Sequence, residues 1–300
     1  MPSPIEVILI PALMILIGFL LKEKSFFKQS DRDLLSKIVL YIALPSLIFI
    51  NLYDADISKN MLFLPIIGVI LSFILLIVGY SYSKMRGYSK KTTWTIIIAS
   101  SMMNTGFIGF PVTLGVYGNA GFLNAMFFDL STSIIFIIYG ILLVREFGGD
   151  KKEVVKQTIS FIPIWAMILA LIFNFLNISL PYVANEILDY FAQATIPLIM
   201  LCLGISLDFK SLGEKLSDSL AVSVIKLIIS PAIIFVLLTL FKIKGMAFNV
   251  GILEAGMSTA MNGLVLSITY DLDTDLMGSL IFTNVILSVF TLTAIITLLA

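Results

Sequence analysis

Three ionisable residues lie inside long apolar stretches, where a charge is costly unless it is paired. Asp129 lies in MFFDLSTSIIF, Lys226 in VSVIKLIISP, and Glu254 just before AGMSTAMNG. Because an ionised group in an apolar medium needs a partner, we expect Asp129 and Lys226 to pair. Such a pair is either a fixed lock or one whose proton or ion occupancy changes. Glu254 either binds a cation or faces water near a membrane interface.

Two stretches combine polar side chains with residues that interrupt a helix. In NTGFIGFP, residues 104–111, Pro111 lacks an amide hydrogen and Gly106 and Gly109 lower the cost of unwinding. The second stretch, AGMSTAMNG at 255–263, has no proline. An interrupted helix exposes amides that attract anions and carbonyls that attract cations. The alternatives are a proline kink with glycines for close packing, and hydroxyls that bond back to the preceding turn.

The polar and helix-interrupting members of both stretches are the expected substrate-binding residues. They are Asn104, Thr105, Gly106, Gly109, Pro111, Ser258, Thr259, Asn262 and Gly263. The expected ion-coupling residues are Asp129, Lys226 and Glu254. The chain has no histidine and one cysteine, and it lacks a nucleotide-binding loop, a zinc motif and a nucleophile elbow. We therefore expect no catalytic residue, no metal ligand and no enzyme.

The composition places these residues in a membrane protein. Of 300 residues, 59% are hydrophobic and 13% are charged. Soluble domains carry about 25% charged residues, whereas a bilayer accepts apolar side chains on the outside of a protein. The net charge is zero, so nothing indicates a nucleic-acid partner. The expected partners are the lipid bilayer and a small molecule.

Ten apolar stretches are each long enough to cross the hydrocarbon core, which takes about 20 helical residues. Pro45 lies in the second and Pro197 in the seventh, where we expect kinks, and the fourth and ninth hold the two interruptions. Each half has five spans and must enter the membrane from opposite sides. We therefore expect inverted repeats over 1–147 and 157–300, joined by a connector at 148–156. The spans cover 4–21, 34–52, 61–83, 92–116, 122–145, 157–176, 184–207, 217–241, 247–270 and 276–299.

Lysine and arginine concentrate in alternate loops of this layout. The loops after the first, third and fifth spans are rich in them, and the loops between are poor. Because basic loops stay in the cytoplasm, this bias places the connector inside and both termini outside. We expect a multi-pass protein of the cell membrane.

Five segments together resemble the auxin efflux carrier family of membrane transporters. They are YIALPSLIF, NTGFIGFPVTLGVYGNAG, FFDLSTS, IPLIMLCLGISL and IKLIISP, and the resemblance covers essentially the whole chain. It implies an all-α fold of ten transmembrane helices in two inverted five-helix repeats, with broken helices 4 and 9 crossing at the centre. The bile acid:sodium symporters and sodium/proton antiporters have related architecture. The short connector resembles prokaryotic members, and the family pattern has proline at the position of Ser258.

The resemblance implies transport of small organic anions, such as indole acetate or dicarboxylates, without a cofactor. We expect an alternating-access carrier, coupled to a proton or a sodium ion or uncoupled. Spans 1, 2, 6 and 7 would form a scaffold against which spans 3–5 and 8–10 move. The alternatives are a sodium/proton antiporter with Asp129 as the cation ligand, and a membrane sensor that binds a ligand without moving it. The substrate and the oligomeric state stay open, with a homodimer as one option.

Overall fold

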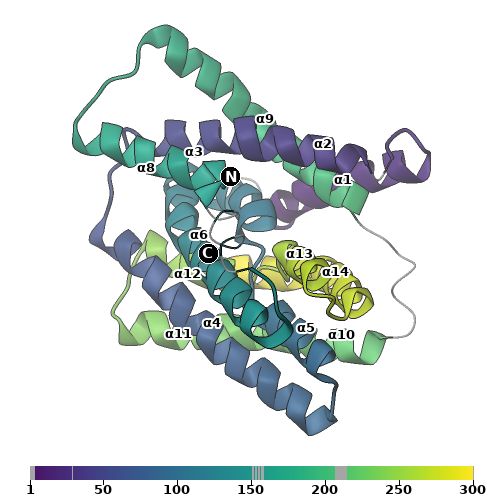
Figure 1. Ribbon diagram of the computed structural model, residues 1–300. Coiled ribbons are helices and arrows are strands. Elements are labelled where there is room, and N and C mark those ends of the chain that lie inside the picture. The colour runs from purple at the N-terminus through teal and green to yellow at the C-terminus, as the bar shows by residue number, and fades with distance from the viewer. Residues whose placement is uncertain are drawn as a thin grey trace. The chain divides into compact units, whose positions relative to one another are not determined.

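The computed structural model describes residues 4–28, 30–150, 152, 154, 156, 159–206 and 215–299 (Figure 1). Within these ranges the chain is helical, with no β-strand and a single isolated bridge. Contacts divide it into two compact units, which are described separately. One contains the described residues of 1–8, 58–155 and 208–300, and the other those of 9–57 and 156–207.

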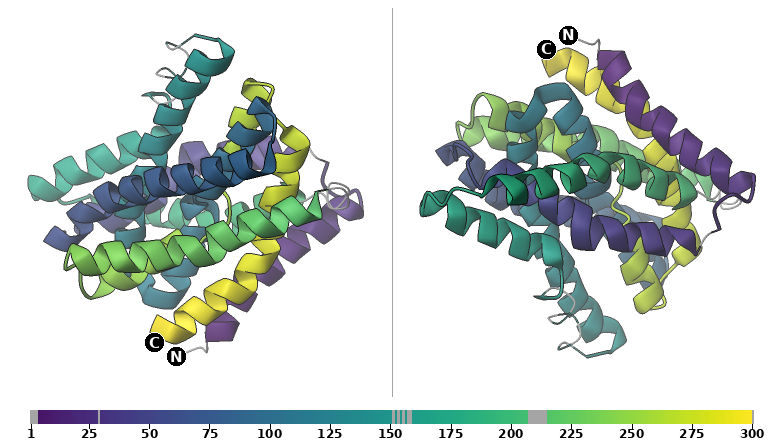
Figure 2. Two further views of the ribbon diagram at one scale, coloured as in Figure 1. Left: turned by 90° about the horizontal axis from the view of Figure 1, so that it is seen from below. Right: turned by 90° about the horizontal axis from the view of Figure 1, so that it is seen from above.

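The first unit contains both predicted interruptions. In its first part, α4 (Lys59–Arg86), α5 (Lys90–Ser101), a π-helical turn η2 (Thr105–Gly109) and α6 (Phe110–Phe147) follow one another. Its second part has α10 (Leu216–Val224), a π-helical turn η4 (Ile225–Ile229), α11 (Ser230–Leu240), α12 (Met246–Ala255), α13 (Asn262–Thr269) and α14 (Thr274–Leu299). The rod formed by α10, η4 and α11 runs beside α4 (Figure 2).

The second unit contains Pro45 and Pro197. It comprises most of α1 (Pro4–Glu23), α2 (Asp31–Ile38), a π-helical turn η1 (Val39–Ala43), α3 (Leu44–Leu52), α8 (Ile162–Phe175) and α9 (Tyr182–Ser206). Pro45 starts the first turn of α3, and Pro197 lies inside α9. Helices α1 and α9 touch so closely that a Cβ on Gly204 would lie 2.1 Å from the Ile15 carbonyl oxygen. Only glycine fits at that contact.

Six helical stretches in the described part of the chain are long and apolar enough to cross a membrane. They are Asp31–Leu52, Lys59–Arg86, Thr105–Phe147, Tyr182–Ser206, Leu216–Leu240 and Thr274–Leu299, with shorter apolar helices at Ile162–Phe175 and Met246–Ala255. The chain is therefore an all-helical, multi-pass membrane protein. The ten-span count, the inverted repeats and the roles of scaffold and moving bundle stay predictions.

Each of the three π-turns in the described part of the chain is followed by an α-helix with a proline in its first turn. These prolines are Pro45, Pro111 and Pro231. Proline cannot donate to the carbonyl four residues earlier, and its ring clashes with it. The wide turn is closed instead by the amide before the proline, as Phe110 N donates to Thr105 O, five residues back. The helix therefore continues through each proline without a break.

Helix α6 changes direction at Gly118, which separates the predicted fourth and fifth spans. Its φ of 62° and ψ of −160° lie outside the helical region, in a conformation that favours glycine.

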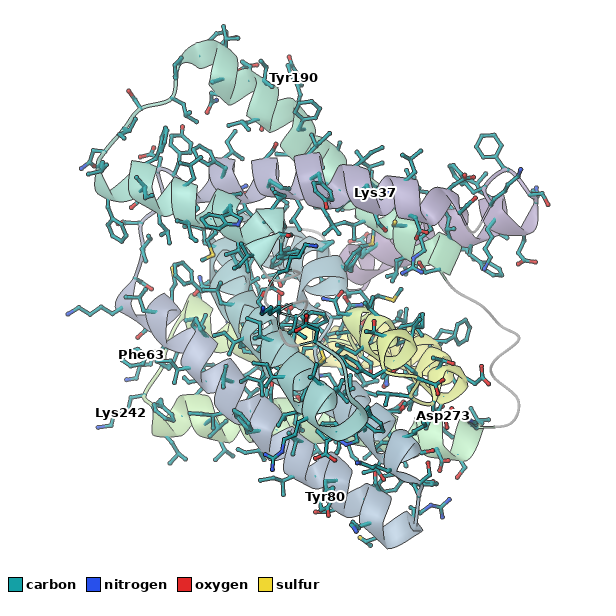
Figure 3. The ribbon with its side chains drawn as sticks, in the orientation of Figure 1. Lys37, Phe63, Tyr80, Tyr190, Lys242 and Asp273 are labelled. Atoms are coloured by element: carbon teal, nitrogen blue, oxygen red, sulfur yellow. The ribbon has the colours of Figure 1, made fainter. Side chains whose placement is uncertain are left out.

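An ion pair and a backbone hydrogen bond hold the residue before α14 in the same unit. Asp273, which directly precedes α14 (Figure 3), accepts from Lys215 Nζ at 2.6 Å and from Leu276 N at 3.0 Å. Partial burial opposes ionisation, but these donors hold the pKa of Asp273 below its usual value.

Candidate functional site

The first interruption lies at residues 102–104, just ahead of most of the predicted stretch. Helix α5 ends at Ser101, and Met102 is extended with φ −94° and ψ 126°. Asn104 has φ −84° and ψ 56°, and helical structure resumes at Thr105. The prediction that the chain unwinds through Pro111 is therefore wrong, because the π-turn η2 absorbs the proline.

The second interruption lies between α12 and α13, at residues 256–261, and it forms without a proline. In a continuous helix the Ala255 carbonyl would accept the amide of Thr259. Here it accepts Lys226 Nζ at 2.9 Å and Ser230 Oγ at 2.7 Å instead. Side-chain donors from η4 and α11 thus replace the helical bond that the Ala255 carbonyl loses at the interruption.

The two interruptions lie antiparallel to each other, and we call residues 102–104 and 256–261 together the crossing. Asn104 N donates to Ser258 O at 2.9 Å, and Ala260 N donates to Met102 O at 3.1 Å. This is the isolated bridge between Met103 and Thr259. Unwound backbone inside a membrane protein must find hydrogen-bond partners within the protein. Each interruption supplies them to the other.

A chain of side-chain hydrogen bonds joins the crossing to α14. Thr259 Oγ1 donates to the Ala99 carbonyl at 2.8 Å, and Asn284 Nδ2 donates to Thr259 Oγ1 at 2.9 Å. Asn284 is fully buried, and its Oδ1 has no partner in the described structure. Sequence reasoning missed this residue, although a lone amide in the apolar run FTNVILSVF is a usable signal.

Two buried donors of the crossing have no partner within the described residues. They are Asn104 Nδ2 and Ser258 Oγ, on side chains with 2% and 0% exposure. Their residues are joined by the backbone bond from Asn104 N to Ser258 O. Helical structure begins at Thr105, directly after Asn104, and at Asn262, four residues after Ser258. Some first-turn amides already have acceptors, since Gly109 N donates to Asn104 O and Gly263 N donates to Ala260 O. Asn104 Nδ2 and Ser258 Oγ are thus free to donate to a further acceptor.

Two carboxylates flank the π-turn η2. Thr105 Oγ1 donates to Asp129, and Thr113 Oγ1 donates to Glu254 Oε1 at 2.7 Å. Glu254 Oε2 is buried and has no partner in the described structure. A Cβ on Gly109 would lie 2.1 Å from this oxygen, so the glycine makes room for the carboxylate. At Gly106 a Cβ would keep 4.0 Å from Asp129 Oδ1.

The predicted ion pair between Asp129 and Lys226 is wrong. Lys226 is fully buried, donates to the Ala255 carbonyl and interacts electrostatically with Glu254. Asp129 instead accepts from Thr105. Glu254 is the acid that interacts electrostatically with both of them. The position of Glu254 in the sequence could have indicated its interaction with Lys226. Glu254 directly precedes Ala255, whose carbonyl needs a new donor once the helix is interrupted.

The remaining predicted site residues have different positions. Gly263 is buried, and a Cβ there would meet Ile98 and Met277 at 3.2 Å, so it serves packing. The side chain of Asn262 is exposed, outside the buried polar cluster. Pro45 and Pro197 belong to the second unit. The structure thus brings together Asn104, Thr105, Gly109, Ser258 and Thr259 with the three charged residues.

The chain matches the model of a family described as membrane transport protein, over residues 5–162 and 151–296. It is similar to an uncharacterized transporter of the archaeon Methanothermobacter thermautotrophicus, with 36% identity over 96% of this chain and 95% of the relative. It is also similar to an uncharacterized transporter of Methanocaldococcus jannaschii, with 34% identity over 93% of each chain. These similarities extend over nearly the full length of all three proteins.

Proposed function

Because the chain belongs to the membrane transport protein family, the auxin efflux carrier family that its sequence resembles, we propose that it is a secondary active transporter of small organic anions. The observation that carries this proposal is the pair of buried, unpartnered donors, Asn104 Nδ2 and Ser258 Oγ. A buried donor without a partner costs about 1–3 kcal/mol. A ligand with acceptor atoms removes that cost when it binds.

A carboxylate has the chemistry that this part of the crossing favours. It presents two acceptor oxygens and no donor when ionised, so it accepts from both side chains at once. Hydrogen bonds to an ionised acceptor are about twice as strong as those between neutral groups. The amides that open η2 and α13 add the positive end of a helix dipole. Substrates of this class include dicarboxylates and indole acetate.

The proposal includes alternating access in the cell membrane, with both termini outside. Spans 1, 2, 6 and 7 act as the scaffold, with kinks at Pro45 and Pro197, and spans 3–5 and 8–10 carry the crossing. Movement is coupled to a proton or a sodium ion through Asp129, Lys226 or Glu254. No cofactor is needed.

Counterflow in liposomes tests the proposal. Purified protein is reconstituted, and entry of labelled malonate, succinate, benzoate and indole acetate is measured against the same unlabelled anion inside. We expect wild type to accumulate at least one label and Asn104→Ala to lower that rate about tenfold or more. Asn60→Ala is the matched control, since Asn60, near the start of α4, donates to the Lys244 carbonyl rather than to the crossing. A normal rate for Asn104→Ala contradicts binding at the crossing.

A sodium/proton antiporter is the second candidate. Two carboxylates flanking a π-turn, one with an unpartnered oxygen, favour cation binding as well as charge coupling. Sodium and pH gradients imposed without any organic anion separate the two functions. Ion exchange under those conditions supports the antiporter, and its absence alongside carboxylate counterflow supports the anion carrier.

A further inference from the structure

Glu254 is a buried acid next to the crossing, and its surroundings suit it to accept a proton during transport. Glu254 is fully buried on α12, with Oε1 held by Thr113 and Oε2 unpartnered. The charged groups that act on it are Asp129 from α6 and Lys226 from η4. In the described part of the chain, α4, α11, α14 and η2 also pack against α12 but direct no charged side chain at Glu254.

The charge balance of this cluster changes when an anion arrives. With all three groups ionised, Asp129, Glu254 and Lys226 carry a net charge of −1, and a bound monocarboxylate makes the net charge −2. Uncompensated charge inside a membrane protein is costly. Uptake of one proton with each anion restores the original balance.

Glu254 is better placed than Asp129 to take that proton. Both accept a threonine hydroxyl, but Asp129 is partly exposed whereas Glu254 is fully buried. Glu254 Oε2 is buried without a hydrogen-bond partner in the described structure, and it faces Gly109, whose missing side chain leaves it room. We propose that Glu254 binds one proton for each carboxylate that binds beside Asn104 and Ser258, so that the protein is an anion–proton symporter. This rests on the proposed function.

The same geometry links the proton to the crossing. Glu254 directly precedes Ala255, whose carbonyl is held by Lys226 Nζ at 2.9 Å. An ionised Glu254 competes with this carbonyl for the ammonium group, and a protonated Glu254 does not. Lys226 is thus a positioning residue, through which the charge of Glu254 acts on the start of the second interruption. The proton enters from the side that supplies the anion and leaves with it on the other side.

Glu254→Gln tests this assignment, because glutamine keeps the shape of a protonated glutamate and cannot release a proton. Two assays use the carboxylate that wild type moves in counterflow: exchange at equal pH, and net uptake driven by acid outside. We expect the variant to keep exchange but to lose gradient-driven accumulation by about tenfold or more. Wild type should carry protons inward with the anion, as an internal pH dye reports. Glu146→Gln, at a surface pair with Lys90, is the matched control and should behave as wild type.

The outcomes separate this inference from the function on which it rests. If wild type moves none of the four anions, the proposed function and the inference both fail. If wild type moves an anion but no proton enters with it, only the inference fails, and this measurement does not depend on any variant folding. The assignment of Glu254 also fails if Glu254→Gln still accumulates the anion under a pH gradient. It fails equally if Asp129→Asn is the variant that keeps exchange at equal pH but loses gradient-driven accumulation.

Discussion

The two interruptions of the crossing leave equivalent carbonyls to be satisfied, at Ala99 and Ala255. Ala99 O accepts the neutral hydroxyl of Thr259 at 2.8 Å. Ala255 O accepts the charged ammonium group of Lys226 at 2.9 Å together with the hydroxyl of Ser230. A neutral cap is indifferent to nearby charge, whereas an ammonium group responds to it.

In the proposed mechanism, this difference gives the two interruptions of the crossing different roles. The first interruption is held by neutral hydrogen bonds and contains the unpartnered donor Asn104 Nδ2. The second is held by a cation that interacts with Glu254, so in the proposed mechanism its geometry depends on the charge of that acid. In the proposed mechanism, substrate binding and proton coupling therefore meet at the backbone bonds between residues 102–104 and 256–261.

Removal of the charged cap should have the largest effect. Lys226→Met takes away a donor to Ala255 O and leaves Glu254 without a buried cation. Loss of one partner from a buried charge cluster costs about 3–5 kcal/mol. We expect a corresponding loss in the free energy of unfolding in detergent, measured by denaturant titration.

A second substitution separates charge from hydrogen bonding in that result. Lys226→Met combined with Glu254→Gln removes the uncompensated carboxylate, so it should recover part of the lost stability. Wild-type stability for the single Lys226→Met variant would show that the ammonium group is not what holds the second interruption.

A substitution that fills the space beside Glu254 should have the next largest effect on stability. A Cβ at position 109 would lie 2.1 Å from Glu254 Oε2, whereas one at position 106 would keep 4.0 Å from Asp129 Oδ1. Gly109→Ala should therefore destabilise the protein by about 1–3 kcal/mol, as overpacking does. Gly106→Ala, on the same π-turn, is the matched control and should be neutral or stabilising. Equal thermal unfolding of the two variants would contradict the close approach of Glu254.

The neutral cap should matter less than the charged one. Thr259→Val removes the donor to Ala99 O and the acceptor of Asn284 Nδ2 while it keeps the shape of the side chain. An unsatisfied buried group costs about 1–3 kcal/mol, so the loss should be smaller than for Lys226→Met. The same denaturant titration ranks the two variants. A larger loss for Thr259→Val would reverse the comparison between the two interruptions.

The sequence predicted the helical class and the position of the second interruption, but it placed the first interruption too far along the chain. Apolar stretches give helix positions directly, and polar residues within them indicate where a helix is interrupted. The partners of Lys226 could not be predicted, because the donor to Ala255 O comes from a segment 29 residues away in sequence. Proline was overrated for a related reason. Its effect depends on whether the preceding turn widens, and at Pro111 it does.

Pro111 therefore gives the smallest predicted effect and the sharpest test of what interrupts the first helix. If the interruption at 102–104 is held by its backbone bonds to Ser258 and Ala260, Pro111→Ala should leave it in place. Conversion of the π-turn η2 to an ordinary α-helical turn should then change the free energy of unfolding by less than about 1 kcal/mol. Antiparallel bridge partners have Cα atoms about 4.5–5.5 Å apart, within the range for a disulfide. In a Cys202→Ser background, Met103→Cys with Thr259→Cys should crosslink equally well with proline or alanine at position 111. A crosslink that forms only with Pro111 would make the proline, rather than the partner segment, the cause of the interruption.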